Sequence, residues 1–170
     1  MDVRHLFRSR RAVRQFTSEP LPEEAQRLIL DAGRRSPSAK NTQPWAFITV
    51  TDRETLEALS RTGTYAGHLA GAALGVAILT LDPASRWSIM FDAGQAAAQM
   101  QIAAWSLGIG SCPATIYQPE EARRILGFPA DYSLNVILSF GYPAELAVFT
   151  EPLRPGGRRT FEETVHFDRW

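Results

Sequence analysis

The sequence predicts a single α+β domain over residues 1–170, in which helices flank a mixed sheet. Three observations lead to this prediction. Apolar residues recur at helical spacing in several segments, most extensively over 89–107. Apolar runs with β-branched residues, such as 46–50 and 134–140, separate these segments and are typical of strands. A chain of 170 residues also has the size of one domain.

The first part of the chain contains two predicted helices and one strand. Apolar residues at helical spacing near the start give a short helix that ends at the arginine cluster, residues 10–14. A second helix opens at 20–24, where prolines and two acids suit a helix N-terminus, and Gly33 can end it. The strand 46–50 follows after a polar loop.

The middle of the chain begins with a predicted helix that Thr51 and Asp52 can cap. Residues 61–70 contain two glycines and are expected to form a loop or a broken helix. The nearly continuous apolar run 72–81 then indicates a central strand that is buried on both faces.

The segment 89–107 is the longest predicted helix and is apolar nearly all round. Two interpretations stay open: its own sheet and a second subunit cover it together, or it is the core helix of a single chain. After a break at 108–111, a helix over 118–127 and the strand 134–140 complete the predicted elements. From Gly141 onward the sequence is irregular.

The composition of the chain argues against several classes of protein. Lys and Arg together number 18, as do Asp and Glu, so the formal net charge is zero. This balance argues against a nucleic-acid partner, because such domains carry a basic excess. Cys112 is the only cysteine, which excludes an intrachain disulfide and fits a reducing compartment. We find no apolar signal region and no apolar run long enough for a bilayer, so we expect a cytoplasmic protein without a membrane partner.

The loop 36–45 carries the most informative group of side chains. Its prolines fix the backbone, Ser38 offers a hydroxyl, and Asn41 and Gln43 offer amides that both donate and accept. Trp45 adds a flat apolar surface. A planar heterocycle with donors and acceptors along its edge would match this set. The alternative is a capped polar loop that a tryptophan anchors to the core.

Four motifs occur in the same order as in a known family. They read RRAVRQF at 10–16, SPSAKNTQPW at 36–45, LGIGSC at 107–112 and RRTFEETVH at 158–166. Together they resemble the nitroreductase family of flavin enzymes, with matches that extend over nearly the whole chain. The resemblance implies a mainly antiparallel sheet, a homodimer with the flavin at the interface, and FMN as the cofactor.

The resemblance gives the arginine cluster a role in binding FMN. It implies that Arg10 and Arg11 lie near the phosphate and ribityl chain, and that Arg14 lies near the pyrimidine edge of the ring. A cation there would stabilise the negative charge of the reduced ring. Ala12 stands where the family usually has serine, so one phosphate contact is missing or falls to the backbone N–H. Without the resemblance, solvated surface arginines are the alternative.

Further FMN contacts are implied in the loop and in a segment that passes behind the flavin. They are Pro37, Ser38, Ala39, Asn41, Gln43, Pro113, Thr115 and Ile116. A backbone N–H of 113–116 would meet the flavin N5. His68 loosely matches a basic contact to the flavin or substrate edge, although a lone histidine is more often a surface or hydrogen-bonded residue. Cys112 is expected to be a buried inert thiol.

The tail 142–170 is rich in proline and glycine and is expected to wrap around another surface. The resemblance implies that this extended arm embraces the partner subunit and brings a basic residue to the phosphate. Arg158 is the first choice for that residue and Arg159 the second. It also implies that residues 36–43 of one chain face the flavin held by the other.

The function predicted in this way is an FMN-dependent oxidoreductase. It would pass electrons from NAD(P)H, as co-substrate, to a small-molecule oxidant such as a nitroaromatic or a quinone. The flavin carries the chemistry, so no catalytic side chain is assigned, and no metal-ligand spacing is present. The alternatives are a specialised relative of the desaturase or dehalogenase type and a flavin-binding protein without turnover. A hydrolase that uses Ser38 or Cys112 lacks a supporting motif.

Overall fold

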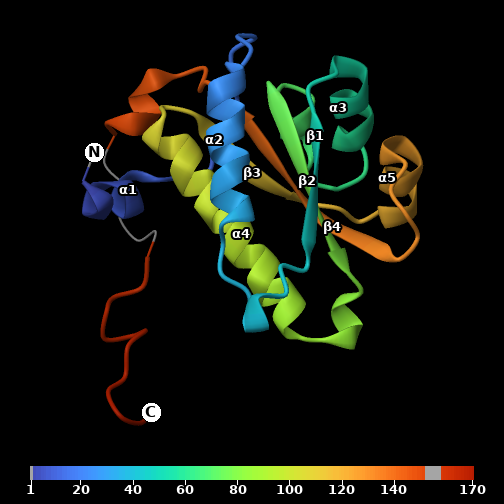
Figure 1. The fold of residues 1–170 in the computed structure, drawn as a ribbon. Helices are drawn as coiled ribbons and strands as arrows, with labels where there is room; N and C mark the ends of the chain where they lie inside the picture. The colour runs from blue at the N-terminus through green and yellow to red at the C-terminus, as the bar shows by residue number, and fades with distance from the viewer. Residues whose placement is uncertain (1, 152–157) are drawn as a thin grey trace.

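A four-stranded sheet with the strand order β1-β2-β4-β3 forms the centre of the molecule (Figure 1). The computed structural model describes residues 2–151 and 158–170. Its strands are β1 (Trp45–Val50), β2 (Leu74–Leu81), β3 (Gly110–Thr115) and β4 (Tyr132–Gly141). The predicted α+β class is confirmed, and the three predicted strands form at β1, β2 and β4.

Helices cover both faces of this sheet. They are α1 (Val3–Ser9), α2 (Glu23–Arg34), α3 (Arg53–Ser60), α4 (Ser88–Ser106) and α5 (Pro119–Leu126). Figure 1 shows α2 and α4 crossing one face, whereas α3 and α5 lie beside the other. Strand β2 sends Val76 and Ile78 toward α2 and α4, and it sends Ala77 and Leu79 toward α3 and α5. It is therefore the buried central strand that the sequence predicts.

The sheet differs in one respect from the mixed sheet that was expected. All three strand pairings, β1 with β2, β2 with β4 and β3 with β4, are antiparallel. Among the described residues, the parallel component is an isolated bridge between Ala12 and Ser111. The sheet of one chain is thus antiparallel, and the N-terminal segment adds a single parallel contact at its β3 edge.

Strand β3 was not predicted, because its sequence reads as a break after the long helix. Gly108 does end that helix region in the left-handed conformation, with φ of 74°. The strand then begins at Gly110 and pairs with β4 along its whole length, from Gly110 opposite Gly141 to Thr115 opposite Val136. Pairing with a strongly β-prone neighbour therefore overrides the weak strand propensity of Gly110–Thr115.

The helix ends agree with the predicted caps except at Gly33. Asp52 accepts a hydrogen bond from the Thr55 N–H over 2.8 Å, and Gly127 ends α5 in the left-handed conformation, with φ of 69°. Helix α2, however, continues through Gly33 to Arg34. A side chain at Gly33 would overlap Met100 of α4, so this glycine permits close helix packing instead of a cap.

No helix in the described part of the chain combines the length and the apolarity that crossing a bilayer requires.

Candidate functional site

The arginine cluster of residues 10–14 lies along the outer edge of β3. The Val13 N–H donates to the carbonyl oxygen of Ser111 over 3.0 Å. Ala12 forms the isolated parallel bridge to the same residue. The chain therefore passes from α1 directly onto this edge, which fixes the backbone from which the Arg14 side chain projects.

Two glycines make this close approach possible. A Cβ atom at Gly110 would stand 2.6 Å from the Cβ of Val13. A Cβ at Gly141 would stand 2.8 Å from a ring carbon of Phe16. Both distances are shorter than real carbon–carbon contacts, so any other residue would push the arginine cluster away from the sheet.

The backbone of β3 presents a donor on the same edge. The Ile116 N–H donates to the carbonyl of Asn135 over 3.0 Å and so points toward β4. The Ser111 carbonyl points the opposite way, toward the arginine cluster. Backbone groups alternate in direction along a strand, so the backbone groups of residues 113 and 115 face the outer edge. Residue 113 is a proline and has no N–H to donate. Thr115 therefore supplies the outward donor, and the Ile116 N–H belongs to the sheet.

The cations of the cluster differ in what they contact. The Arg11 Nη2 donates to the carbonyl of Glu151 over 2.5 Å, so this guanidinium binds the start of the C-terminal tail. Arg14 is exposed and borders a cleft of about 270 Å³. Residues 12–15, Pro143, Glu145 and Val148 line this cleft. Arg10 is half-buried at the end of α1. The structure thus leaves Arg14 better placed for a ligand than Arg11.

A buried polar group lies behind β3, next to Arg14. The His68 Nδ1 is 2.8 Å from the Ser139 hydroxyl oxygen, and that hydroxyl donates to the Cys112 carbonyl over 3.2 Å. Both His68 and Cys112 are buried. His68 is therefore a hydrogen-bonded core residue, which is the alternative that the sequence analysis kept open.

Arg14 acts electrostatically on both ionisable groups of this cluster. Burial lowers the pKa of His68, and the positive charge of Arg14 lowers it further, against an opposing effect of the Pro113 carbonyl. Burial raises the pKa of Cys112, and the nearby Arg14 guanidinium partly opposes that rise. At neutral pH the imidazole is therefore uncharged and the thiol protonated. A protonated thiol is a poor nucleophile, which agrees with the inert role expected of Cys112.

The signature loop, residues 36–45, is held at the beginning of α4. The Ala39 N–H donates to both carboxylate oxygens of Asp92 over 3.2 Å. Asp92 is only 1% exposed. Arg86 lies 4.0 Å from this carboxylate and donates to the Thr42 hydroxyl over 2.6 Å. One buried acid and one arginine therefore position the loop.

Three non-glycine residues of the loop adopt the left-handed conformation. The φ angles are 54° at Lys40, 53° at Asn41 and 46° at Gln43. The Ser38 hydroxyl accepts from the Gln43 N–H over 2.9 Å, which uses this side chain inside the loop. The side chains of Asn41 and Gln43 are exposed. Left-handed conformations of this kind are uncommon outside glycine and concentrate at functional sites.

The two parts of the predicted site lie at opposite ends of α4 in one chain. The loop meets α4 at Asp92, whereas the Trp105 Nε1 donates to the Ser9 hydroxyl over 2.9 Å beside the arginine cluster. At 1.5 Å per residue, these two positions on the helix are about 20 Å apart. The fold of one chain therefore does not bring Asn41 and Gln43 to Arg14.

The predicted phosphate contacts of the tail are exposed to solvent in this chain. Arg158 and Arg159 are exposed, as are all residues from 158 to 170. Among the described residues, the hydrogen bonds of this segment stay within it, such as that from the Thr160 N–H to Glu163 over 2.8 Å. Residues 152–157 of the predicted arm lie outside the described part of the chain.

Two residues of the site escaped the sequence analysis. Asp92 is the single charged residue between Ser88 and Ser106, and that isolation within an apolar helix is a signal that could have identified it. Ser139 gives no such signal, because its partner His68 lies 71 residues away in the sequence.

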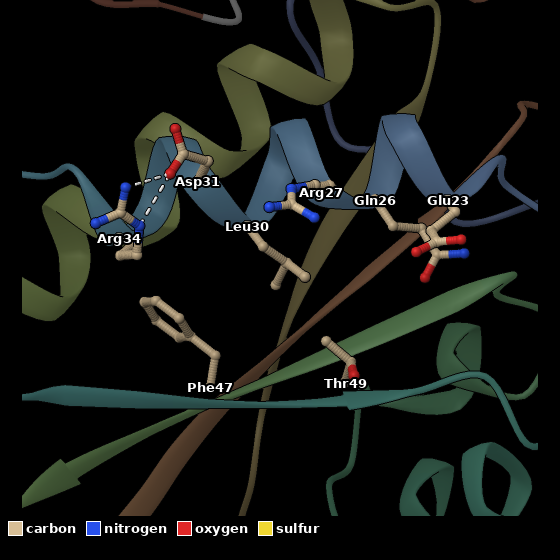
Figure 2. Close-up of a pocket in the computed structure, with 8 residues that line it drawn as sticks. All are labelled: Glu23, Gln26, Arg27, Leu30, Asp31, Arg34, Phe47 and Thr49. Carbon is tan, nitrogen blue, oxygen red and sulfur yellow. Dashed lines mark hydrogen bonds and ion pairs between the residues drawn. The ribbon is translucent and has the colours of Figure 1, made fainter.

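A larger hollow of about 630 Å³ lies between α2 and β1 (Figure 2). Its walls include Leu30 and Phe47, and an Asp31–Arg34 ion pair with a contact of 2.6 Å stands at its rim. None of the site residues predicted from the sequence lines it. The predicted site residues therefore lie elsewhere than at this larger hollow.

Comparison with known proteins supports the resemblance on which the sequence analysis relied. A family model described as the nitroreductase family matches residues 7–66 and 60–142. A relative from Methanothermobacter thermautotrophicus is 31% identical to this chain over 179 residues. That relative is provisionally named NADH dehydrogenase/NAD(P)H nitroreductase. That match covers 100% of this chain and 88% of the relative.

Two further proteins extend the comparison. An NADH dehydrogenase of Thermus thermophilus is 29% identical, over 85% of this chain and 88% of the relative. The structure of an FMN-dependent nitroreductase from Clostridium difficile R20291 superimposes with a TM-score of 0.86 at 28% identity. It covers 99% of this chain and 100% of that chain.

Proposed function

This chain belongs to the nitroreductase family, and we propose that it binds FMN and passes electrons from NAD(P)H to a small organic oxidant. Nitroaromatics and quinones are the acceptor classes that we propose. Membership makes the protein an oxidoreductase of the NAD(P)H nitroreductase type. The observation that best supports an FMN site is the placement of Arg14 and the Thr115 N–H on one outer edge of β3.

The donors of this edge suit the polar groups of FMN. Guanidinium and backbone N–H groups only donate hydrogen bonds, and FMN offers phosphate and ring carbonyl oxygens as acceptors. We assign Arg14 to the pyrimidine edge, the Thr115 N–H to the flavin N5, and Arg10 to the phosphate. Ala12 is exposed and has no hydroxyl, so it contributes backbone only. Arg11 would have to release Glu151 before it could join the phosphate site.

We propose that the site is completed by a second copy of the chain. Within one chain the amide-bearing loop stands about 20 Å along α4 from the arginine cluster, so a partner must supply one of them. The outward face of α4 suits such a partner, because Phe91, Gly94 and Ala98 are exposed on it at helical spacing. The small residues would let a partner backbone approach this face closely, and Phe91 would pack against it.

The same dimer would explain the C-terminal tail. Residues 158–170 are exposed and carry Phe161, Phe167 and Trp170, which are 60%, 77% and 97% exposed. A segment with such side chains lacks a core of its own, so we propose that it packs against the partner subunit. There Arg158, or Arg159 beside it, would reach the phosphate of the partner's FMN.

The chemistry of the proposed reaction belongs to the flavin, which when bound accepts a hydride and passes electrons on. The residues of the chain bind and orient it. The Arg14 charge would favour negative charge at the pyrimidine edge, which raises the reduction potential. Asn41 and Gln43 from the partner would hydrogen-bond the ring edge. No side chain of the described residues needs to act as an acid or base in this scheme.

A spectroscopic experiment tests the proposal directly. The purified protein, supplied with FMN, should show a bound flavin spectrum, and anaerobic NADH or NADPH should bleach it. Adding a nitroaromatic or a quinone should then restore the oxidised spectrum. A protein that does not bind FMN refutes the cofactor assignment. A bound flavin that neither nicotinamide reduces would favour the alternative of flavin binding without turnover.

A further inference from the structure

A closed ring of polar contacts joins the signature loop to the beginning of α4. The Ala39 N–H donates to both carboxylate oxygens of Asp92 over 3.2 Å, and the Ala39 carbonyl accepts from the Thr42 hydroxyl over 3.1 Å. The Arg86 Nη2 donates to the same hydroxyl oxygen over 2.6 Å and lies 4.0 Å from Asp92. The ring therefore has two members on the loop and two at the start of α4.

The two loop members of this ring enclose residues with a left-handed backbone. Lys40 and Asn41, with φ of 54° and 53°, lie between them in the sequence. Such conformations cost free energy in residues other than glycine, so surrounding contacts must hold them. The ring supplies contacts at both ends of this strained pair. It therefore fixes the backbone from which the exposed Asn41 side chain projects.

Arg86 also compensates the charge of a buried acid. Asp92 is 1% exposed, and an ionised carboxylate at such a site needs a nearby cation or several hydrogen-bond donors. Among the residues that the structure describes, Arg86 is the basic residue that forms an ion pair with it. One guanidinium nitrogen thus serves the carboxylate of the helix and the hydroxyl of the loop together.

This arrangement is unfavourable for the other polar atoms around it. The Arg86 Nε is buried without a hydrogen-bond partner in the described part of the chain, and so is the Ser88 hydroxyl. Orphaned buried polar atoms are uncommon and cost stability. Proteins retain such costs mainly at functional sites. The orphaned atoms therefore favour a functional reason for Arg86 over a purely structural one.

We propose that Arg86 is a positioning residue, which holds residues 39–42 so that the amides of the loop meet the FMN bound by the partner subunit. These amides are those of Asn41 and Gln43. This consequence rests on the proposed function, because it requires a flavin site shared between two chains. The clamp itself does not, since its four members belong to one chain. Arg86 thus acts in trans: its loss impairs the site of the other chain and spares its own.

Amide exchange tests the clamp without any cofactor. Arg86→Met removes the charge and the donors, and Thr42→Val removes the hydroxyl, whereas Thr42→Ser retains it. We expect Arg86→Met and Thr42→Val to accelerate exchange at residues 38–43 about tenfold, the effect of one hydrogen bond to a charged group. Thr42→Ser should leave exchange unchanged, as should the control Arg61→Met, at an exposed arginine that pairs with Glu57. Exchange in Arg86→Met that equals the parent's overturns the inference.

Mixed dimers test whether Arg86 acts on the flavin of the partner. A chain carrying Arg86→Met is combined with a chain carrying Arg14→Ala, each with its own affinity tag. Homodimers of either variant should bind FMN about tenfold more weakly than the parent. The mixed dimer should bind one FMN with the affinity of the parent, because one of its sites combines an intact Arg14 with an intact loop. A mixed dimer without such a site overturns the inference.

A reference pair separates this inference from the proposed function. The mixed dimer of Gln43→Ala with Arg14→Ala tests the shared site alone. If this pair regains one site of parent affinity and the Arg86→Met pair does not, the inference fails while the shared site stands. If neither pair regains a site, the shared site fails and the action of Arg86 in trans fails with it. If the parent does not bind FMN, the cofactor assignment fails, and amide exchange still decides whether Arg86 holds the loop.

Discussion

The two ends of α4 hold their functional segments in different ways. At its C-terminal end, the arginine cluster lies on the sheet because Gly110 and Gly141 leave room for Val13 and Phe16. At its N-terminal end, one buried carboxylate, Asp92, holds a loop whose residues adopt left-handed conformations without glycine. The first end depends on close packing, and the second on polar contacts from Asp92 and Arg86.

This difference has a physical consequence. Close packing of backbone against backbone resists movement, because any displacement opens a void or forces an overlap. A loop held through a few polar contacts, such as those of Asp92 and Arg86, can move locally once one of them is lost. We therefore expect the arginine end to determine global stability and the loop end to determine local order. The predictions below test this comparison, from the largest expected effect to the smallest.

The largest effect should come from Trp105→Ala. Trp105 is 1% exposed, packs against the tilted ring of Phe149 with centroids 4.6 Å apart, and donates to the Ser9 hydroxyl over 2.9 Å. Its truncation should lower the free energy of unfolding by about 3–5 kcal/mol in urea denaturation. Trp87→Ala, at a side chain that is 81% exposed, should stay within about 0.5 kcal/mol. Similar losses for both would contradict a packed arginine end.

The second prediction concerns the tail. Arg158→Ala should weaken FMN binding about 10- to 100-fold, because a phosphate loses a charged partner, and titration calorimetry measures this. Arg11→Ala should have a smaller effect, since Arg11 binds the Glu151 carbonyl. The reverse order would assign the phosphate contact to Arg11 and reject Arg158.

The third prediction tests the close approach at Gly110. Gly110→Ala places a methyl group 2.6 Å from the Cβ of Val13 and should destabilise the protein by about 1–3 kcal/mol. Combining it with Val13→Gly should recover most of this loss. Gly71→Ala, where a Cβ would meet nothing within 4 Å, is the control. A neutral Gly110→Ala would show that the segment can shift without cost.

The fourth prediction addresses the loop anchor. Asp92→Ala removes the acceptor of the Ala39 N–H and should cost about 1–2 kcal/mol, with faster amide exchange confined to residues 38–43. Asp131→Ala, at an exposed carboxylate, should leave both quantities unchanged. If Asp92→Ala accelerates exchange in the strands as well, the loop is not an independent unit.

The smallest effect should be the pH dependence from His68. Its pKa in the folded protein is lowered from the usual 6.5, so the folded state binds this proton less readily than the unfolded chain. The contribution of neutral His68 to the free energy of unfolding is therefore complete above about pH 6.5. It is lost as the pH falls toward the lowered pKa of His68 in the folded state. Urea denaturation of the parent and of His68→Gln between pH 7 and pH 5 measures this contribution. The free energy of unfolding should show this loss in the parent and not in His68→Gln.

Local patterns were sufficient for the helices and for three strands. Periodic apolar residues defined α2, α4 and α5, and β-branched apolar runs defined β1, β2 and β4. Strand β3 could not be predicted in this way, because its residues form a strand only through pairing with β4. Gly33 was misassigned for a related reason: its partner, Met100, lies on another helix.

The sequence by itself determined the family, the order of the helices and of three strands, and the candidate residues for flavin binding, because motifs and periodicity are local properties of the chain. Only the tertiary structure decided that His68 contacts Ser139, that Arg11 binds the Glu151 carbonyl, and that the two predicted halves of the site stand at opposite ends of α4. These relations depend on long-range pairing and on the length of a helix, and no local pattern encodes them.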